Sequence, residues 1–165
     1  MDKRPIASFI AVSTLIVLLS CGKDPVNQPS PATSKKYQVY LFSAPWCEPC
    51  RKELKELGPL WANQDENIRK NISLKLFVQE GEVQGTKPTP ESTLQFQESL
   101  GLTLETVADD WRWKTYRGLI KNSWNLPAAV VIDEGGNKVK AFVAPPKFTP
   151  QELVDYLNEL LKSPA

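Results

Sequence analysis

Two cysteines separated by two residues, Cys47 and Cys50, directly follow a short strand-like segment of this 165-residue chain. The segment, residues 37–42, reads YQVYLF and runs into a proline turn, a pattern typical of a buried strand. Leucines then recur at helical spacing and predict a helix over about residues 47–64. A strand that passes into a helix at a pair of thiols confines the chain to folds in which helices pack on a sheet.

The rest of the chain alternates predicted strands and helices. Strands are expected at residues 72–78, 129–133 and 138–143, the last two joined by a Gly-Gly turn. Helices are expected from Thr89-Pro90 to about residue 100, over 111–121 behind a capping Asp109 or Asp110, and after Thr149. This order predicts an α/β domain with a central mixed β-sheet flanked by helices.

The cysteine pair has the spacing and position of a redox-active dithiol. A cysteine at a helix N-terminus lies beside free backbone N–H groups and the positive end of the helix dipole, and both favour the thiolate. Cys47 is therefore the candidate nucleophile, and Cys50, within one helical turn, is the candidate resolving thiol. Two alternatives stay open, a structural disulfide and a zinc half-site, although zinc requires four ligands and the chain has three cysteines and no histidine.

Composition narrows the possible functions further. The lack of histidine excludes triads that depend on an imidazole, histidine-ligated metals and covalent haem attachment through a CxxCH motif of this chain. Lys and Arg number 20 against 19 Asp and Glu, without a basic block, so nucleic acid is not an expected partner.

The first residues have the pattern of an export signal. Residues 1–20 combine Lys3 and Arg4 with a short apolar run and are interpreted as a signal peptide. The run ends in Leu-Leu-Ser-Cys21, which resembles the lipobox of bacterial lipoproteins and predicts lipidation of Cys21. Residues 21–35 are polar and proline-rich and should form a flexible tether, leaving 36–165 as the folded domain. The alternatives are an uncleaved membrane helix and an ordinary signal with an incidental cysteine.

Residues 37–161 resemble the thioredoxin superfamily. The resemblance rests on the first strand, on the sequence APWCEPC that contains Cys47 and Cys50, and on Leu126-Pro127 before the strand AVVID. It implies a thioredoxin-like fold in which Pro127 is cis and faces the cysteines, and in which Leu126 offers backbone atoms to a bound substrate strand. Trp46, Pro49, Leu126 and Pro127 would then line the substrate groove.

A closer resemblance is to the membrane-anchored TlpA/ResA-type thiol-disulfide oxidoreductases. It rests on Glu48-Pro49 between the cysteines, on the predicted anchor, and on the 77 positions that separate Cys50 from Pro127, which imply an inserted helical segment between the CxxC helix and the cis-Pro strand. It also implies that Glu53 tunes or relays the proton of the thiol pair, with Glu48 in support; the alternative for Glu53 is a solvated helix carboxylate. In thioredoxin a buried aspartate lies six residues before the first cysteine, whereas this chain has Leu41 there.

The expected function is that of a membrane-anchored thiol-disulfide oxidoreductase on the periplasmic side of a bacterial membrane. The negative charge of Glu48 beside Cys47 opposes thiolate formation and favours the direction of a reductase. No cofactor beyond the Cys47–Cys50 disulfide is expected. A membrane thiol relay would donate electrons and a disulfide of an exported protein would accept them, for example during cytochrome c biogenesis. The alternatives are an oxidase or isomerase, and a redox-inactive module for binding or assembly.

The aromatic residues allow two interpretations, a substrate groove or the core; they are Trp46, Trp111, Trp113, Tyr116 and Trp124. Trp46 abuts the reactive thiol and is expected near the surface. We expect Trp111 and Trp124 in the core, the commoner place for tryptophans at such spacing.

Overall fold

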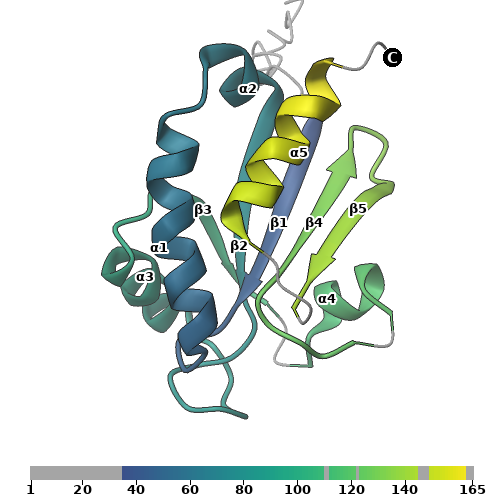
Figure 1. The fold of residues 1–165 in the computed structure, drawn as a ribbon. Helices are drawn as coiled ribbons and strands as arrows, with labels where there is room; N and C mark the ends of the chain where they lie inside the picture. Colours follow the sequence, from purple (N-terminus) through teal and green to yellow (C-terminus); the bar gives the residue numbers. More distant parts are fainter. Residues whose placement is uncertain (1–34, 110–111, 122, 145–148, 163–165) are drawn as a thin grey trace, which may run out of the picture. The chain divides into compact units, whose positions relative to one another are not determined.

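Five strands form one mixed sheet in the order β3-β2-β1-β4-β5 (Figure 1). The computed structural model describes residues 35–109, 112–121, 123–144 and 149–162. Strands β1 (Tyr37–Ser43), β2 (Ile72–Val78) and β3 (Glu105–Ala108) run parallel to one another. Strand β4 (Ala128–Asp133) is antiparallel to β1, and β5 (Lys138–Val143) is antiparallel to β4. The predicted α/β fold with a mixed sheet is confirmed.

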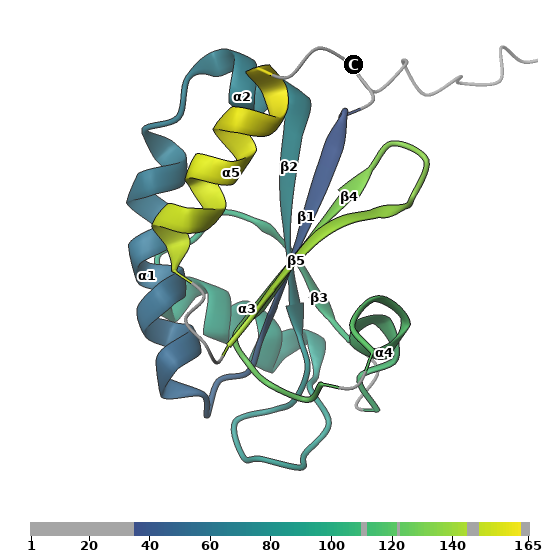
Figure 2. The same cartoon turned by 45° about the vertical axis from the view of Figure 1, so that its right-hand side comes forward.

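Helices cover both faces of this sheet (Figure 2). Helices α1 (Glu48–Ala62) and α5 (Pro150–Lys162) pack on one face, and α4 (Lys114–Leu119) packs on the other. The short helix α2 (Glu66–Asn71) joins α1 to β2, and α3 (Pro90–Ser99) places Phe96 in the same core as α1. Within the described ranges, no helix is both long enough and apolar enough to cross a membrane.

Two hydrophobic cores follow from the alternation of side chains along the strands. Val39 and Leu41 of β1 face α1 and α5, whereas Phe42 faces α4. Beneath α4, Phe42 meets Tyr116 edge to face, with ring centroids 5.2 Å apart. The two faces of β1 thus carry a large leucine-rich core and a smaller aromatic core.

The helix starts follow local capping chemistry. Thr149 and Glu152 form the predicted capping box at α5, because the N–H of Glu152 donates to Thr149 Oγ1 and the N–H of Thr149 donates to the Glu152 carboxylate. At α3, Thr89 caps the helix through the N–H of Ser92, and Pro90 occupies the first turn. The predicted starts of both helices are therefore confirmed.

The segment between α3 and β4 differs from the prediction. Strand β3 was not expected, and the helix expected over 111–121 is shorter, extending over Lys114–Leu119. The N-cap residue is Trp113 and not Asp109, whose carboxylate accepts a hydrogen bond from Thr115 Oγ1 at 2.7 Å. Asp110 lies outside the described residues. Trp113 precedes the helix in the left-handed region at φ 57°, a backbone conformation that sequence patterns rarely announce for a bulky residue.

All the described strands and helices lie in one compact unit, Thr33–Ala165. The predicted signal peptide, the lipidation site Cys21 and nearly all of the predicted tether lie outside the described residues, as does Trp111. That α3, β3 and α4 constitute an insertion into the fold stays a prediction.

Candidate functional site

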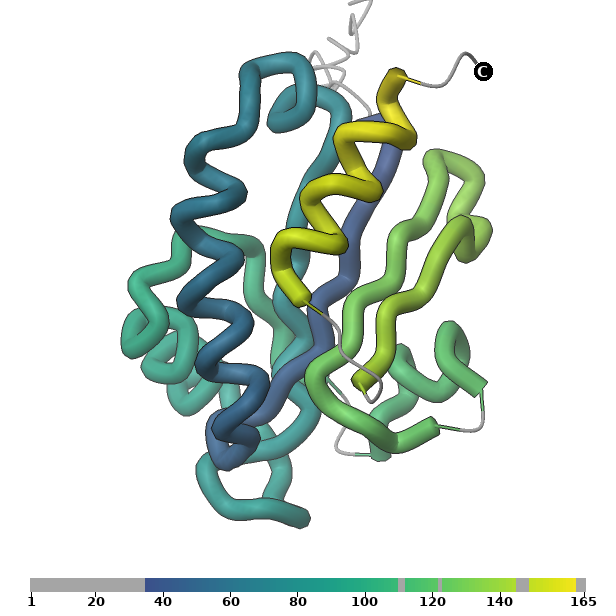
Figure 3. Tube along the Cα trace, viewed as in Figure 1, coloured from purple at the N-terminus to yellow at the C-terminus, as the bar shows by residue number. Residues whose placement is uncertain are grey.

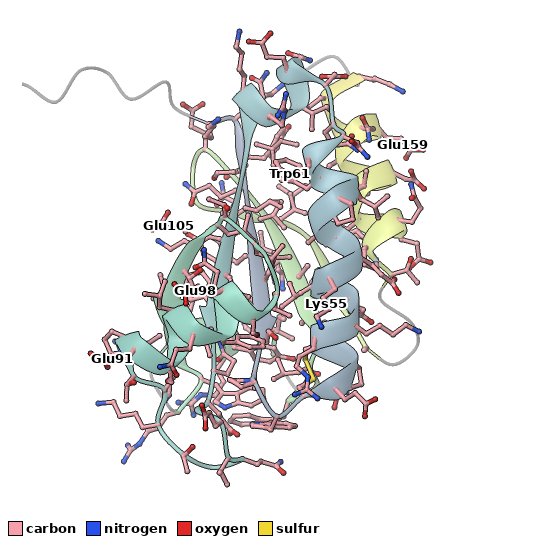
Figure 4. The ribbon with its side chains drawn as sticks, turned by 90° about the vertical axis from the view of Figure 1, so that its left-hand side faces the viewer. Lys55, Trp61, Glu91, Glu98, Glu105 and Glu159 are labelled. Carbon is pink, nitrogen blue, oxygen red and sulfur yellow. A yellow bond between two sulfur atoms is a disulfide. The ribbon has the colours of Figure 1, made fainter. Side chains whose placement is uncertain are left out.

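Cys47 and Cys50 are joined by a disulfide bond at the start of α1. The two Cα atoms lie 5.3 Å apart, and the bond is visible at the N-terminal end of the helix in Figure 4. Both residues are buried, Cys47 with 4% of its surface exposed and Cys50 with none. Of the two residues only Cys47 keeps any exposed surface, in keeping with its expected role as the nucleophile.

The start of α1 is built around the sulfur of Cys47. Cys47 is the N-cap residue, and the backbone N–H of Cys50 donates towards its Sγ at 3.3 Å. Glu48 and Pro49 occupy the first turn, where a proline sacrifices no intrahelical hydrogen bond. When the disulfide is reduced, the same N–H group and the positive end of the helix dipole favour a thiolate on Cys47.

The sheet topology places Pro127 at the end of β1 that leads into the CxxC turn. Strand β4 runs antiparallel to β1, and Ala128 at its start pairs with Phe42 near the end of β1. Pro127, which precedes Ala128, therefore lies next to the end of β1, where the chain continues into the CxxC turn. The Leu126–Pro127 peptide bond is cis, as the resemblance implied.

The expected groove residues surround the disulfide to different extents. Trp46 and Leu126, both half-buried, pack against an apolar cluster of Ala44 and the two cysteines. Pro127 is buried, and Pro49 is exposed. Trp46 and Leu126 thus meet at the disulfide, whereas Pro49 lies on the solvent side of the first turn.

Glu53 is half-buried one turn beyond Cys50, and its Oε2 is enclosed without a hydrogen-bond partner. The pKa of Glu53 is raised from 4.5 to about 7, mainly by burial and also by the nearby Glu56, while Lys52 acts in the opposite direction. A carboxyl group with a pKa near neutrality can take up or release a proton beside a titrating thiol. These features favour the proton-relay interpretation of Glu53. Glu48 is exposed and can act on the thiols through its charge alone.

Glu80 is a further site residue that the sequence analysis missed. It follows β2, and one carboxylate oxygen accepts hydrogen bonds from Trp46 Nε1 and from the backbone N–H of Gly85, both at 2.8 Å. The other oxygen accepts a hydrogen bond from Trp113 Nε1 at 3.2 Å. One carboxylate therefore ties the CxxC turn to the loop after β2 and to the start of α4.

Tyr116, one of the aromatic residues that the sequence left open between groove and core, lies in the core. It is fully buried on α4, and its hydroxyl donates to the carbonyl oxygen of Asn125 at 2.9 Å. Ser123 Oγ lies 3.3 Å from the same hydroxyl. Because Asn125 directly precedes Leu126-Pro127, α4 holds the segment that faces the disulfide.

Removing the Tyr116 hydroxyl tests how strongly its hydrogen bond holds the segment that contains Leu126 and Pro127. Tyr116→Phe should lower the free energy of unfolding by about 1 to 1.5 kcal/mol, the usual net contribution of a hydrogen bond. Urea unfolding measures the change. Tyr40→Phe is the matched control, because its hydroxyl bonds only to Gln38 on the exposed surface and its loss should cost less. Equal losses in the two variants would show that Tyr116 does not anchor the segment.

The expected position of Trp124 differs from the one in the structure. Trp124 has 59% of its surface exposed, so its expected place in the core is wrong. It follows the end of α4, and helical spacing cannot reveal that the chain leaves this residue largely exposed there. Among the described residues, no group of three or more His, Cys, Asp or Glu side chains is placed to hold a metal ion.

Solved structures share this architecture. The crystal structure of StoA from Bacillus subtilis has 19% sequence identity, covers 76% of this chain and 84% of its own, and gives a TM-score of 0.56. A secreted Mycobacterium tuberculosis disulfide oxidoreductase homologous to E. coli DsbE has 20% identity over 78% of this chain and 85% of its own, with a TM-score of 0.54. An uncharacterized thioredoxin-like protein from Porphyromonas gingivalis has 19% identity over 77% and 76%, with a TM-score of 0.55. No family model and no curated protein matches the sequence. At these identities the likeness establishes a shared fold.

Proposed function

We propose that this chain, which has a thioredoxin-like fold, is a protein thiol-disulfide oxidoreductase that reacts through Cys47 and Cys50. The observation that carries the proposal is the disulfide at the N-terminus of α1, against which Trp46 and Leu126 pack. A structural disulfide gains little from closing so short a loop, whereas a dithiol at this position is chemically activated.

The reaction consists of two thiol-disulfide exchanges. The Cys47 thiolate attacks one sulfur of a substrate disulfide, forms a mixed disulfide and releases the other substrate sulfur as a thiolate, which takes up a proton. The Cys50 thiol then gives up its proton, for which Glu53 is the nearby acceptor, and attacks the Cys47 sulfur. The second substrate thiolate leaves and is protonated, so the substrate gains two electrons and the protein ends with the Cys47–Cys50 disulfide.

The reducing direction is favoured by the charge beside the pair. Glu48 lies in the first turn next to Cys47, and a carboxylate there disfavours the thiolate and so favours the disulfide form of the protein. A pair that prefers to be oxidised gives up its electrons readily. This feature supports a reductase over an oxidase.

Continuous turnover requires a second protein that supplies electrons. The sequence contains no GxGxxG fingerprint for a nicotinamide cofactor, so the donor is proposed to be a membrane thiol relay that returns two electrons to the disulfide. The acceptors would be disulfides in exported proteins, such as the CxxCH pair of an apocytochrome c. The lipobox-like sequence that ends at Cys21 supports a lipid anchor on the periplasmic side of the membrane.

The reduction potential of the Cys47–Cys50 pair tests the direction. The chain from Lys35 onward contains every described element and can be equilibrated with glutathione and dithiothreitol buffers. A potential near or below roughly −270 mV, that of thioredoxin, is expected for a reductase. A potential of roughly −120 to −180 mV would instead identify an oxidase or isomerase, and a pair that never equilibrates with the buffers would contradict redox activity altogether.

A further inference from the structure

A cleft of about 330 Å³ opens beside the CxxC turn and is not used by the exchange reaction itself. We call it the tryptophan cleft, after three of its lining residues. Its main walls are Trp46, Trp113 and Trp124, with Glu80, Gln84 and Arg112 between them. Figure 3 shows how the start of α1, the loop after β2 and the segment around α4 gather at one end of the sheet.

Glu80 holds two of the three indole rings in place. Its carboxylate accepts hydrogen bonds from Trp46 Nε1 at 2.8 Å and from Trp113 Nε1 at 3.2 Å. The N–H of Gly85 donates to the same carboxylate and fixes the loop that completes the wall. These contacts organise the cleft before any ligand is present, which reduces the entropic cost of binding.

Trp124 is the accessible ring of the cleft. Its ring centroid lies 5.7 Å from that of Trp113, and the Arg117 guanidinium lies over its ring at 5.5 Å, yet 59% of the residue remains exposed. An exposed tryptophan that borders a preformed cleft is typical of a binding surface, because tryptophan is enriched among residues that dominate binding energy.

Size and charge define what the cleft can accept. Its volume is at the low end for small-molecule pockets and suits one large side chain. Arg112 in the wall and Arg117 over Trp124 disfavour a cationic guest. The oxygens of Glu80 already accept three hydrogen bonds from the protein. The indole surfaces that remain match an uncharged aromatic ring, which stacks against tryptophan in an offset or edge-to-face manner.

The position of the cleft identifies its occupant. Trp46 both packs against the cysteines and lines the cleft, so the cleft lies one residue's breadth from the site at which a substrate polypeptide is joined to Cys47 in a mixed disulfide. Building on the proposed function, we propose that the tryptophan cleft binds an aromatic side chain of the substrate polypeptide, within about three residues of the cysteine that reacts with Cys47. The cleft thereby makes the protein selective among disulfide-containing chains.

Reduction of matched peptides by the full chain, solubilised in detergent and reduced beforehand, tests the proposal. Each peptide contains one CxxC disulfide and differs only at the residues two and three positions before the first cysteine, which are tryptophan, alanine, lysine or glutamate. Stopped-flow measurement of the second-order rate constant should show the tryptophan peptide reacting at least about tenfold faster than the other three. Equal rates, or a faster lysine or glutamate peptide, would overturn the proposal.

Variants then test whether the preference for the tryptophan peptide arises in the tryptophan cleft. Trp124→Ala should bring the ratio of tryptophan-peptide to alanine-peptide rates close to one, and Trp124→Phe should retain part of it. Leu94→Ala, which truncates a comparably exposed apolar residue outside the cleft, should keep the wild-type ratio. A Trp124→Ala protein with an unchanged ratio would overturn the assignment.

The small disulfide 5,5′-dithiobis(2-nitrobenzoate) separates the two proposals. If this compound and all the peptides fail to react, the proposed redox function fails. Equal reduction of all the peptides refutes the role of the cleft alone.

Discussion

Replacing Cys47 with serine is expected to reduce catalysed thiol-disulfide exchange by at least about 10³-fold, to the background rate of the assay, because a serine hydroxyl cannot form the mixed disulfide. The reduction of an insulin disulfide by dithiothreitol in the presence of the protein measures the change. The loss should be confined to the chemistry. Serine has nearly the size of cysteine, and the N–H of Cys50 that now points at Cys47 Sγ can donate to the serine oxygen as in an ordinary N-cap.

Cys50→Ser is the matched variant that assigns the two roles. It retains the Cys47 nucleophile but lacks the resolving thiol, so it should form mixed disulfides with substrate proteins and release them slowly. Non-reducing gel electrophoresis detects these adducts, which should be absent from Cys47→Ser. Adducts formed by Cys47→Ser and not by Cys50→Ser would reverse the assignment. A Cys47→Ser protein with full exchange activity would refute the proposed function.

Glu53→Gln should slow the attack of Cys50 on the mixed disulfide by about 10²-fold at pH 8, the usual contribution of a positioned general base. In the wild-type protein this step should accelerate as the pH rises through about 7, because the Glu53 carboxylate can accept the Cys50 proton only when it is ionised. Single-turnover kinetics between pH 5 and 9 measure the profile. In Glu53→Gln the rise near pH 7 should disappear, leaving only the ionisation of the thiols.

Glu56→Gln is the control for a simple loss of negative charge. Glu56 is exposed on the same helix, and its charge helps to raise the pKa of Glu53. Its replacement should therefore keep the rate at pH 8 and shift the inflection to slightly lower pH. If Glu53→Gln and Glu56→Gln have the same profile, Glu53 is a solvated helix carboxylate and not a proton relay.

Stability should depend on pH through the same carboxyl group. The pKa of Glu53 is about 7 in the folded, oxidised protein and 4.5 for an unperturbed carboxyl, so folding favours the protonated form. Between these two values the folded state binds more protons than the unfolded state, and the free energy of unfolding falls as the pH rises. Urea unfolding at pH 4.5 and pH 7.5 should show a smaller decrease for Glu53→Gln than for the wild-type protein.

The elements that the sequence predicted well are those formed by contiguous residues. Strand β2 and strand β5 begin and end at the predicted residues, because alternating or β-branched runs bounded by turn residues carry their own signal. The start of α5 was predicted equally well, since its capping box involves only Thr149 and Glu152. The cis bond before Pro127 was expected from the family resemblance and not from local chemistry.

The sequence did not predict strand β3 or the length of α4. The four residues of β3 predict a strand only weakly by their own sequence. They form one because they pair with the edge of β2. Trp113 adopts a left-handed backbone conformation at the start of α4, where its indole also donates to Glu80. Both features depend on partners more than 25 residues away in the sequence, which no local pattern encodes.

The amino-acid sequence specified the chemistry: two thiols at the start of a helix, a carboxyl group one turn further on, and the strands and caps that build an α/β sheet. The three-dimensional structure determined how these groups are arranged. Packing encloses Glu53 Oε2 and raises the pKa of that residue, and the antiparallel register of β1 and β4 places Pro127 next to the end of β1 that leads to the cysteines. Glu80 accepts hydrogen bonds from Trp46 and Trp113 and so holds both rings at one cleft. Burial and long-range hydrogen bonds arise only when distant segments meet, so they could be learned only from the three-dimensional structure.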